Sequence, residues 1–195
     1  MGIQFFENLI KISDKIYHFS TDEFLCSNIY ALFENSNIEK SKFILIDTGS
    51  GLVDISRKPE MVLLTHNHSD HTKGVKENWN NVFIHENDLK FKKGFENICY
   101  VPKNAEKIKT RKLDIFDFNL EIFHTPGHTE GSICILENKN KILFSGDTYF
   151  GNGIFGRTDL GGDLEKMKKS LHFISSLDFE ILCPGHGKIS VHEHF

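Results

Sequence analysis

The sequence is poor in cysteine and proline, and it lacks any long hydrophobic run. Its four cysteines and four prolines are spread over 195 residues, and no two cysteines form a C-x-x-C pair. We therefore expect neither a disulfide framework nor a cysteine zinc site, and we interpret the cysteines as reduced thiols of a cytosolic protein. No apolar run approaches the roughly 18 residues of a membrane span, so we expect no membrane segment.

Neither sign of charge dominates the chain. It carries 23 Lys and Arg against 27 Asp and Glu, a formal net charge of −4, which gives no overall attraction to nucleic acid or to an anionic membrane. The most basic stretch, residues 103–112, is interrupted by Glu106, and we interpret it as a solvated strand edge or hairpin. Residues 1–7 lack a basic segment followed by a long apolar one, which argues against a signal peptide and for a cytoplasmic location.

Length and composition predict one domain over residues 1–195, because 39% hydrophobic and 26% charged residues suit a packed core. Runs rich in Ile, Leu, Val and Phe predict strands at residues 29–33, 43–47, 61–65, 82–85, 120–124, 132–136, 141–145 and 180–183. Helical patterns cover residues 70–78, 86–93 and 163–177, the last with Asp163 as its N-cap. Strands with interspersed helices predict a layered α/β protein.

Histidine is the abundant residue, with 11 copies in the chain. Four predicted strands run directly into loops that carry histidine or aspartate, which is where α/β proteins place their chemistry. These loops supply seven residues of metal-ligand type: His66, His68, Asp70, His71, His128, Asp147 and His186. Imidazole suits zinc, iron, nickel and copper, and a carboxylate can bridge two cations. The pattern therefore predicts a pair of divalent metal ions, one held by His66 and His68 and the other within reach of Asp70 and His71.

Residues 65–71 (THNHSDH) resemble the signature of the metallo-β-lactamase superfamily. Further segments match the other motifs of that superfamily in the same order: residues 45–49 (LIDTG), 125–132 (TPGHTEGS), 144–148 (FSGDT) and 184–187 (PGHG). The resemblance implies a four-layer αβ/βα sandwich, in which two mixed β-sheets face each other, helices flank them and the metals lie at one edge.

The resemblance also implies which ligand holds which ion. It assigns His66, His68 and His128 to the first ion, Asp70, His71 and His186 to the second, and Asp147 to a bridge between them. Asp47 would lie behind the site as a carboxylate that orients a ligating histidine, or else be a turn residue at a strand end. The ions are expected to be zinc, with iron or manganese as alternatives.

The segment after Asp147 is similar to that of hydroxyacylglutathione hydrolases (glyoxalase II) and their short single-domain relatives. The similarity rests on residues 146–150 (GDTYF) and 155–163 (FGRTDLGGD), whereas the commonest zinc β-lactamases carry cysteine in place of Asp147. It implies a dinuclear hydrolase of a small thioester such as S-lactoylglutathione, in which Asp70 orients a metal-bound hydroxide. Tyr149 would bind substrate or serve as a packing residue.

Two departures from glyoxalase II accompany this similarity. The chain ends nine residues after His186, so we expect it to lack the C-terminal helical domain that helps to bind glutathione. The segment between Asp47 and His66 is short, as if a helix were trimmed. Two other functions stay open: a mononuclear Fe(II) persulfide dioxygenase, which would use His66, His128 and Asp147, and a metal-stabilised domain without enzymatic activity.

Overall fold

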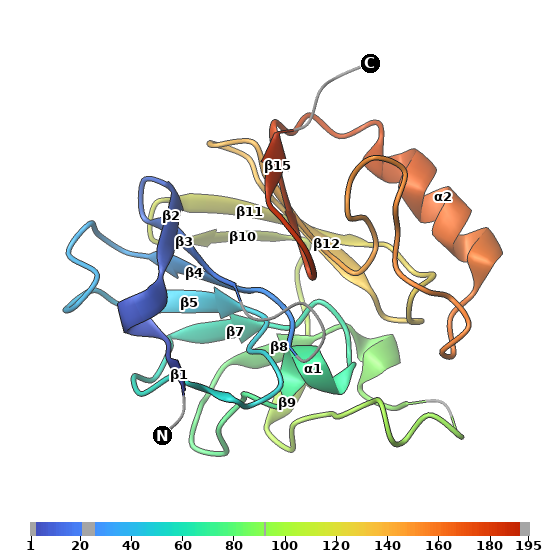
Figure 1. Ribbon diagram of the computed structural model, residues 1–195, viewed down its shortest axis with the longest axis horizontal. Coiled ribbons are helices and arrows are strands. Elements are labelled where there is room, and N and C mark those ends of the chain that lie inside the picture. Colours follow the sequence, from blue (N-terminus) through green and yellow to red (C-terminus); the bar gives the residue numbers. More distant parts are fainter. Residues whose placement is uncertain (1–2, 21–25, 92, 192–195) are drawn as a thin grey trace.

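The computed structural model describes residues 3–20, 26–91 and 93–191. Residues 1–2, which belong to the N-terminal segment analysed for a signal peptide, lie outside the described residues. Two mixed β-sheets form the centre of the described chain (Figure 1). The seven-stranded sheet has the order β2 (Ile10–Ser13), β3 (Ile16–Phe19), β4 (Ile29–Phe33), β5 (Phe43–Ile46), β7 (Met61–Leu63), β8 (Val82–Ile84) and β9 (Ala105–Lys107). Its pairing is antiparallel from β2 to β5 and parallel from β5 to β9.

The second sheet has six strands, in sequence order: β10 (Lys112–Ile115), β11 (Phe118–His124), β12 (Ile133–Glu137), β13 (Ile142–Gly146), β14 (Ile181–Pro184) and β15 (Ser190–Val191). Only the β13–β14 pairing in it is parallel. A small parallel ladder joins β1 (Ile3–Gln4) to β6 (Val53–Asp54). The predicted fold, a sandwich of two mixed sheets, is confirmed.

Three apolar clusters hold the layers together. The middle cluster lies between the sheets and joins residues such as Ile44 and Leu63 of the first sheet to Leu120 and Phe144 of the second. A second cluster covers the outer face of the first sheet, and a third packs the second sheet against α2 (Leu164–Ile174), which lies on its outer side in Figure 1. Strands β4, β5, β12 and β13 are buried throughout because both of their faces are covered.

Helices are fewer and shorter than the sequence patterns predict. Helix α2 agrees with the prediction, and its N-cap Asp163 accepts hydrogen bonds from the backbone N–H groups of Glu165 and Lys166 at 2.9 and 3.0 Å. The helix expected over residues 70–78 is only α1 (Ser69–Thr72). It ends early because the chain packs closely against Thr48, where a side chain on Gly74 would collide with the Thr48 carbonyl oxygen.

The helix predicted over residues 86–93 is also wrong for the described part of that range, where only the short 3₁₀ helix η2 (Glu86–Asp88) forms; residue 92 lies outside the described residues. Its Asp88 carboxylate turns into the protein to accept hydrogen bonds from two other loops, which a surface helix would not allow. A second 3₁₀ helix, η1 (Phe6–Asn8), follows β1. The segment 48–65 contains β6, β7 and no helix, in agreement with the trimmed segment seen in the sequence. Within the described residues, none of the helices has the length and apolar character needed to cross a bilayer.

Candidate metal centre

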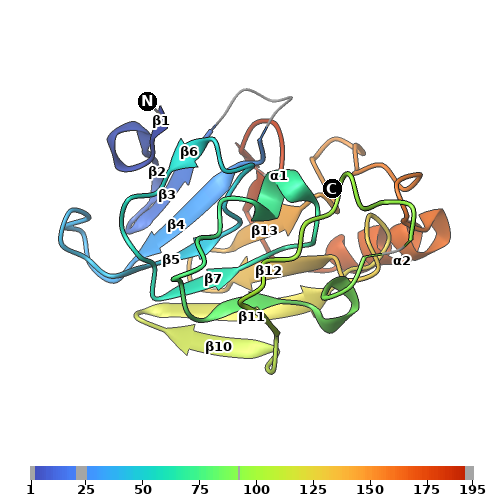
Figure 2. The same cartoon turned by 90° about the horizontal axis from the view of Figure 1, so that it is seen from below.

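The seven predicted ligands come together at one edge of the sandwich. They lie in the loops that follow β7, β11, β13 and β14, and Figure 2 shows α1 close to β13 at this edge. Their ligand atoms form three groups within 4.8 Å: His66 with His68 and His128, His66 with His71 and Asp147, and Asp70 with His71 and His186. The groups share members, so they form one continuous cluster, referred to below as the metal cluster.

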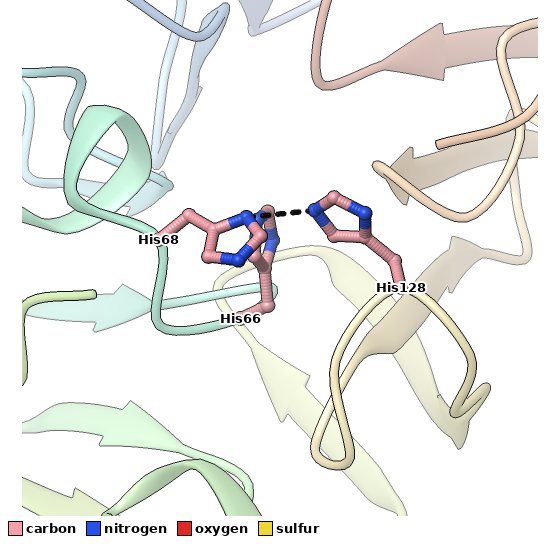
Figure 3. Close-up of side chains that lie close together, drawn as sticks. All are labelled: His66, His68 and His128. Carbon is pink, nitrogen blue, oxygen red and sulfur yellow. Dashed lines mark hydrogen bonds between the residues drawn. The ribbon is translucent and has the colours of Figure 1, made fainter. Parts of the chain in front are cut away.

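The first group consists of three imidazoles. His66, His68 and His128 are buried, and their ring centroids lie 4.5 to 4.7 Å apart. Figure 3 shows the three rings turned toward one another, with Nδ1 of His68 only 2.8 Å from Nε2 of His128. Two nitrogens bound to one tetrahedral zinc ion lie about 3.3 Å apart, so the ring positions suit a shared ion.

The group of Asp70, His71 and His186, called the second group below, combines imidazole with carboxylate. Nε2 of His71 lies 3.3 Å from Nε2 of His186, which in turn lies 3.1 Å from Oδ2 of Asp70. The side chain of His71 is fully buried, whereas those of Asp70 and His186 are 36% and 24% exposed. This half of the metal cluster therefore faces the solvent.

Asp147 lies between the two groups. Its Oδ1 is 3.2 Å from Nε2 of His71, and its Oδ2 is 3.4 Å from Nε2 of His128 and 3.6 Å from Nε2 of His186. One carboxylate thus reaches ligands of both groups, as a bridge between two cations requires.

Three buried polar atoms of the metal cluster are without a hydrogen-bond partner among the described residues: Nε2 of His66, Nε2 of His68 and Oδ1 of Asp147. An unpaired buried polar atom is costly, so such atoms call for a ligand. The other nitrogen of His66, Nδ1, lies 3.1 Å from Oγ1 of Thr65, and Nδ1 of His128 donates to the backbone oxygen of Arg157 at 2.7 Å. These hydrogen bonds direct the Nδ1 protons of His66 and His128 away from the metal cluster, so Nε2 of each ring carries the lone pair, and that of His128 faces Nδ1 of His68. The residues present therefore fit a divalent metal ion.

Asp47 lies behind the predicted ligands and forms a hydrogen bond with one of them directly. Its Oδ2 accepts from Nδ1 of His71 at 2.7 Å and from Oγ1 of Thr65 at 2.8 Å, and its Oδ1 accepts from the Thr65 N–H at 2.8 Å. The Thr65 hydroxyl in turn accepts from Nδ1 of His66, so one carboxylate fixes two ligating rings, directly and through Thr65. Asp47 adopts a φ of +58°, a sparsely populated conformation held by this network.

The electrostatics of the metal cluster favour a bound cation. Burial lowers the pKa of His68 to about 3 and that of His66 well below its ordinary value, so both rings are neutral and ready to ligate. Burial would also lower the pKa of His71, but the surrounding carboxylates of Asp147, Asp47 and Asp70 raise it well above its ordinary range. The same negative surroundings that favour a proton on His71 favour a divalent ion in its place.

The segment after Asp147 supports His128. The backbone oxygen of Arg157 accepts from the His128 ring, and Gly156 lies so close that a side chain there would collide with the Asp147 carbonyl oxygen. The Arg157 side chain forms an exposed bidentate pair with Asp159 at 2.9 and 2.7 Å. The backbone of this segment, rather than its charged side chains, therefore contacts the metal cluster.

Asp88 is a functional candidate that the sequence analysis missed. It is 2% exposed and accepts hydrogen bonds from the N–H of Asn67 at 3.0 Å, from Oγ1 of Thr129 at 2.7 Å and from the N–H of Gly131 at 2.8 Å. Asn67 precedes a ligand and Thr129 follows one, so Asp88 ties together the two loops that carry the first group. No local pattern marks this residue, because its partners are distant in sequence.

Tyr149 lies in the apolar layer beneath α2, and substrate binding by this residue stays a prediction. It packs against the apolar cluster that includes Ile174 and Phe179 beneath α2, and it lines a cavity of about 190 Å³ there. This cavity is lined by none of the seven predicted ligands.

Known sequences resemble the chain along most of its length. Residues 30–186 match the metallo-beta-lactamase superfamily. The chain is 30% identical over 172 residues to a hydroxyacylglutathione hydrolase of Francisella philomiragia, and the match covers 76% of this chain and 63% of that protein. It is 33% identical over 150 residues to the hydroxyacylglutathione hydrolase GloC of Haemophilus influenzae, covering 66% and 68%. A probable metallo-hydrolase of Methanocaldococcus jannaschii is 29% identical over 191 residues, covering 84% and 88%.

Solved structures agree with these sequence matches. The B3 metallo-beta-lactamase BLEG-1 superimposes with a TM-score of 0.65 at 29% identity, covering 85% of this chain and 88% of that one. TTHA1623, solved in a di-iron-bound form, gives a TM-score of 0.64 at 26% identity, covering 88% and 93%. Sequence motifs, sheet topology and ligand geometry lead to one conclusion: the chain belongs to the metallo-beta-lactamase superfamily.

Proposed function

We propose that the chain is a dinuclear metallohydrolase that cleaves thioesters, of the hydroxyacylglutathione hydrolase type. The observation that carries the proposal is the position of Asp147, whose two oxygens reach ligands of both groups. Two of the relatives described above bear the name hydroxyacylglutathione hydrolase, and a third is a probable metallo-hydrolase. Because the match spans under two thirds of the Francisella philomiragia protein, the activity of that protein is carried over here only as a proposal.

The donor set supports zinc as the resident metal. Five imidazoles and two carboxylates supply the nitrogen and oxygen ligands that zinc and iron both accept, and the di-iron form of TTHA1623 keeps iron as the alternative. His66, His68 and His128 would hold one ion, and Asp70, His71 and His186 the other. When bound, such ions lower the pKa of a water molecule and polarise a carbonyl group.

Asp70 is the residue that we propose as catalytic. Hydrolysis adds a hydroxyl group to the acyl carbon, breaks the carbon–sulfur bond and returns a proton to the departing thiolate. Oδ2 of Asp70 faces His186, so its Oδ1 would hold the proton of the attacking water and deliver it to the thiolate. Burial alone would raise the pKa of Asp70, but His71 and His186 hold it below its ordinary value, so the carboxylate is ionised and able to orient the water.

The half-exposed side of the metal cluster, at Asp70 and His186, would receive the substrate. We also propose that the enzyme acts in the cytoplasm on a small-molecule thioester. Neither nucleic acid nor a membrane is proposed as its partner.

The test combines elemental analysis with a substrate panel. Protein produced without added metal should contain two equivalents of zinc and hydrolyse S-lactoylglutathione and a coenzyme A thioester, and excess chelator should abolish both activities. One iron per chain with O₂ uptake on a glutathione persulfide would instead support the dioxygenase. Metal binding without turnover of either substrate class would support a metal-stabilised domain and contradict the proposal.

A further inference from the structure

A second cavity lies apart from the metal cluster. It opens between η2, residues 108–111, the end of β11 and α2, and its volume of about 510 Å³ is within the range of small-molecule sites. None of the seven predicted ligands lines it. It is referred to below as the basic groove, defined by His85, Lys109, Arg111, Phe123, His124 and Phe173.

Every ionisable side chain that lines the basic groove is basic, whereas the chain as a whole carries a net charge of −4. The available carboxylates neutralise these cations poorly. Nζ of Lys109 lies 3.3 Å from Oε2 of Glu106, and both side chains are more than half exposed. The Arg111 guanidinium is 75% exposed and only reaches within 4.0 Å of Glu121. Exposed pairs of this kind are weak, so both cations remain available to an anionic ligand.

The floor of the basic groove is apolar and aromatic. The rings of Phe123 and Phe173 meet edge to face with centroids 5.2 Å apart, and the side chain of Phe173 is still 38% exposed. The Arg111 guanidinium carbon lies 5.8 Å from the Phe123 ring centroid. Phe123 is 7% exposed, so Phe173 supplies the exposed aromatic surface of the floor. A cation close to such a surface suits a ligand that joins an anionic group to a flat apolar body.

Two histidines form a preformed wall of the basic groove. The rings of His85 and His124 stack with centroids 3.9 Å apart and planes 10° from parallel. Nδ1 of His85 accepts from the Asn87 N–H at 3.2 Å, and Nε2 of His124 donates to the Glu130 backbone oxygen at 2.8 Å. Backbone hydrogen bonds therefore fix both rings before any ligand arrives, and Nε2 of His85 is left as a donor.

We propose that the basic groove binds a small organic anion, a carboxylate or phosphate attached to an aryl body. The anionic group would lie against Arg111 and Lys109, and the aryl body against Phe123 and Phe173. The inference does not depend on the proposed hydrolase activity, because the groove shares no lining residue with the metal cluster.

The experiment titrates the metal-loaded protein with phenyl phosphate and phenylacetate, followed by calorimetry and by amide resonances. We expect a Kd below about 1 mM for at least one of them, with shifts at residues 108–111 and 122–124. The tighter probe identifies the preferred anionic group. A Lys109→Gln/Arg111→Gln double variant should weaken binding by about tenfold or more. The charge-matched control Lys103→Gln/Lys112→Gln, whose positions do not line the groove, should change Kd less than about twofold.

Three results would overturn the proposal. One is no binding of either probe at about 10 mM. Another is binding of inorganic phosphate or of neutral 2-phenylethanol with the same affinity as the aryl anions. The site would then recognise charge alone, or apolar surface alone. The third is an equal loss in the control variant, which would mean non-specific attraction. Unchanged metal content in both variants verifies that they fold.

Discussion

The two halves of the metal cluster are built in different ways. The first half, His66, His68 and His128, contains only imidazoles, and these residues are 0%, 6% and 3% exposed. The second half adds a carboxylate, and the side chains of Asp70 and His186 are 36% and 24% exposed. The buried half is held in advance by neighbouring hydrogen bonds and packing, whereas the open half carries charge toward the solvent.

This difference assigns retention of a metal ion to the buried half and reaction with water and substrate to the open half. Neutral, buried rings, two of which have their second nitrogens engaged in hydrogen bonds, form a rigid site for an ion, because little has to be rearranged on binding. The open half can admit water and substrate, and its carboxylate can carry a proton. We therefore expect the first half to retain its ion more firmly, and the following predictions test that division in order of decreasing effect.

Asp147→Asn should have the largest effect, because it removes the carboxylate that both halves share. The lost charge no longer offsets the repulsion between two cations, so metal content should fall below two per chain, and kcat should fall by about 10³-fold or more. Elemental analysis and kcat on the same preparation provide the measurement. Retention of two metals with near-full activity would show that Asp147 is not the bridge.

Asp70→Asn should affect the open half alone. The ion of the first half should stay in place, while kcat falls by about 10²-fold through lost orientation of the water and lost proton transfer. Asp178→Asn, which changes an exposed carboxylate outside the metal cluster, serves as the control and should leave kcat and metal content unchanged. Loss of all metal from Asp70→Asn would contradict the division into two halves.

Asp88→Asn should remove a pH-dependent contribution to stability that Asp88 makes in the wild-type protein. Burial raises the pKa of Asp88 to about 6, although hydrogen bonds from Thr129, Gly131 and Asn67 oppose the shift. The unfolded value is about 3.9, so the folded protein holds the proton more tightly, and the stability from this group is present below about pH 4 and lost as pH rises to about 6.

The free energy of unfolding of wild type relative to Asp88→Asn should therefore decrease by up to about 3 kcal/mol between pH 4 and pH 6. Denaturant titrations at several pH values, with metal removed from both proteins, measure this difference. A difference that is independent of pH would mean that Asp88 stays ionised throughout.

Arg157→Ala should have the smallest effect, although it lies beside the first half. Only the backbone oxygen of Arg157 contacts His128, and its side chain forms a solvent-exposed pair with Asp159, so metal content should be unchanged and kcat should change less than about twofold. Gly156→Ala is the contrasting variant and should lower metal content, because its side chain would collide with the backbone after β13. Equal effects of the two would mean that the Arg157 side chain has a direct role.

The sequence predicted the interior strands well and the edges poorly. All eight predicted strands occur, since continuous apolar runs such as residues 43–46 are typical of strands covered on both faces. Edge strands such as β2 and β10 were missed because they are short and mix charged with apolar residues, and their pairing rather than their composition makes them strands. The edge strand β9 lies within residues 103–112, which the sequence analysis interpreted as a solvated strand edge or hairpin. The lengths of the two short helices were overestimated for a related reason. Close packing of Gly74 ends one of them, and the inward orientation of Asp88 ends the other.

The sequence alone identified the seven candidate ligands and the strands that precede them along the chain. It could do so because ligand chemistry belongs to side-chain type, and loops at the ends of buried strands meet at one edge. Only the tertiary structure decided which atoms face one another, that Asp88 joins two ligand loops, and that Arg111 lies beside Phe123. These relations join residues that are distant along the chain, and their geometry follows from how the two sheets pack, which no local pattern records.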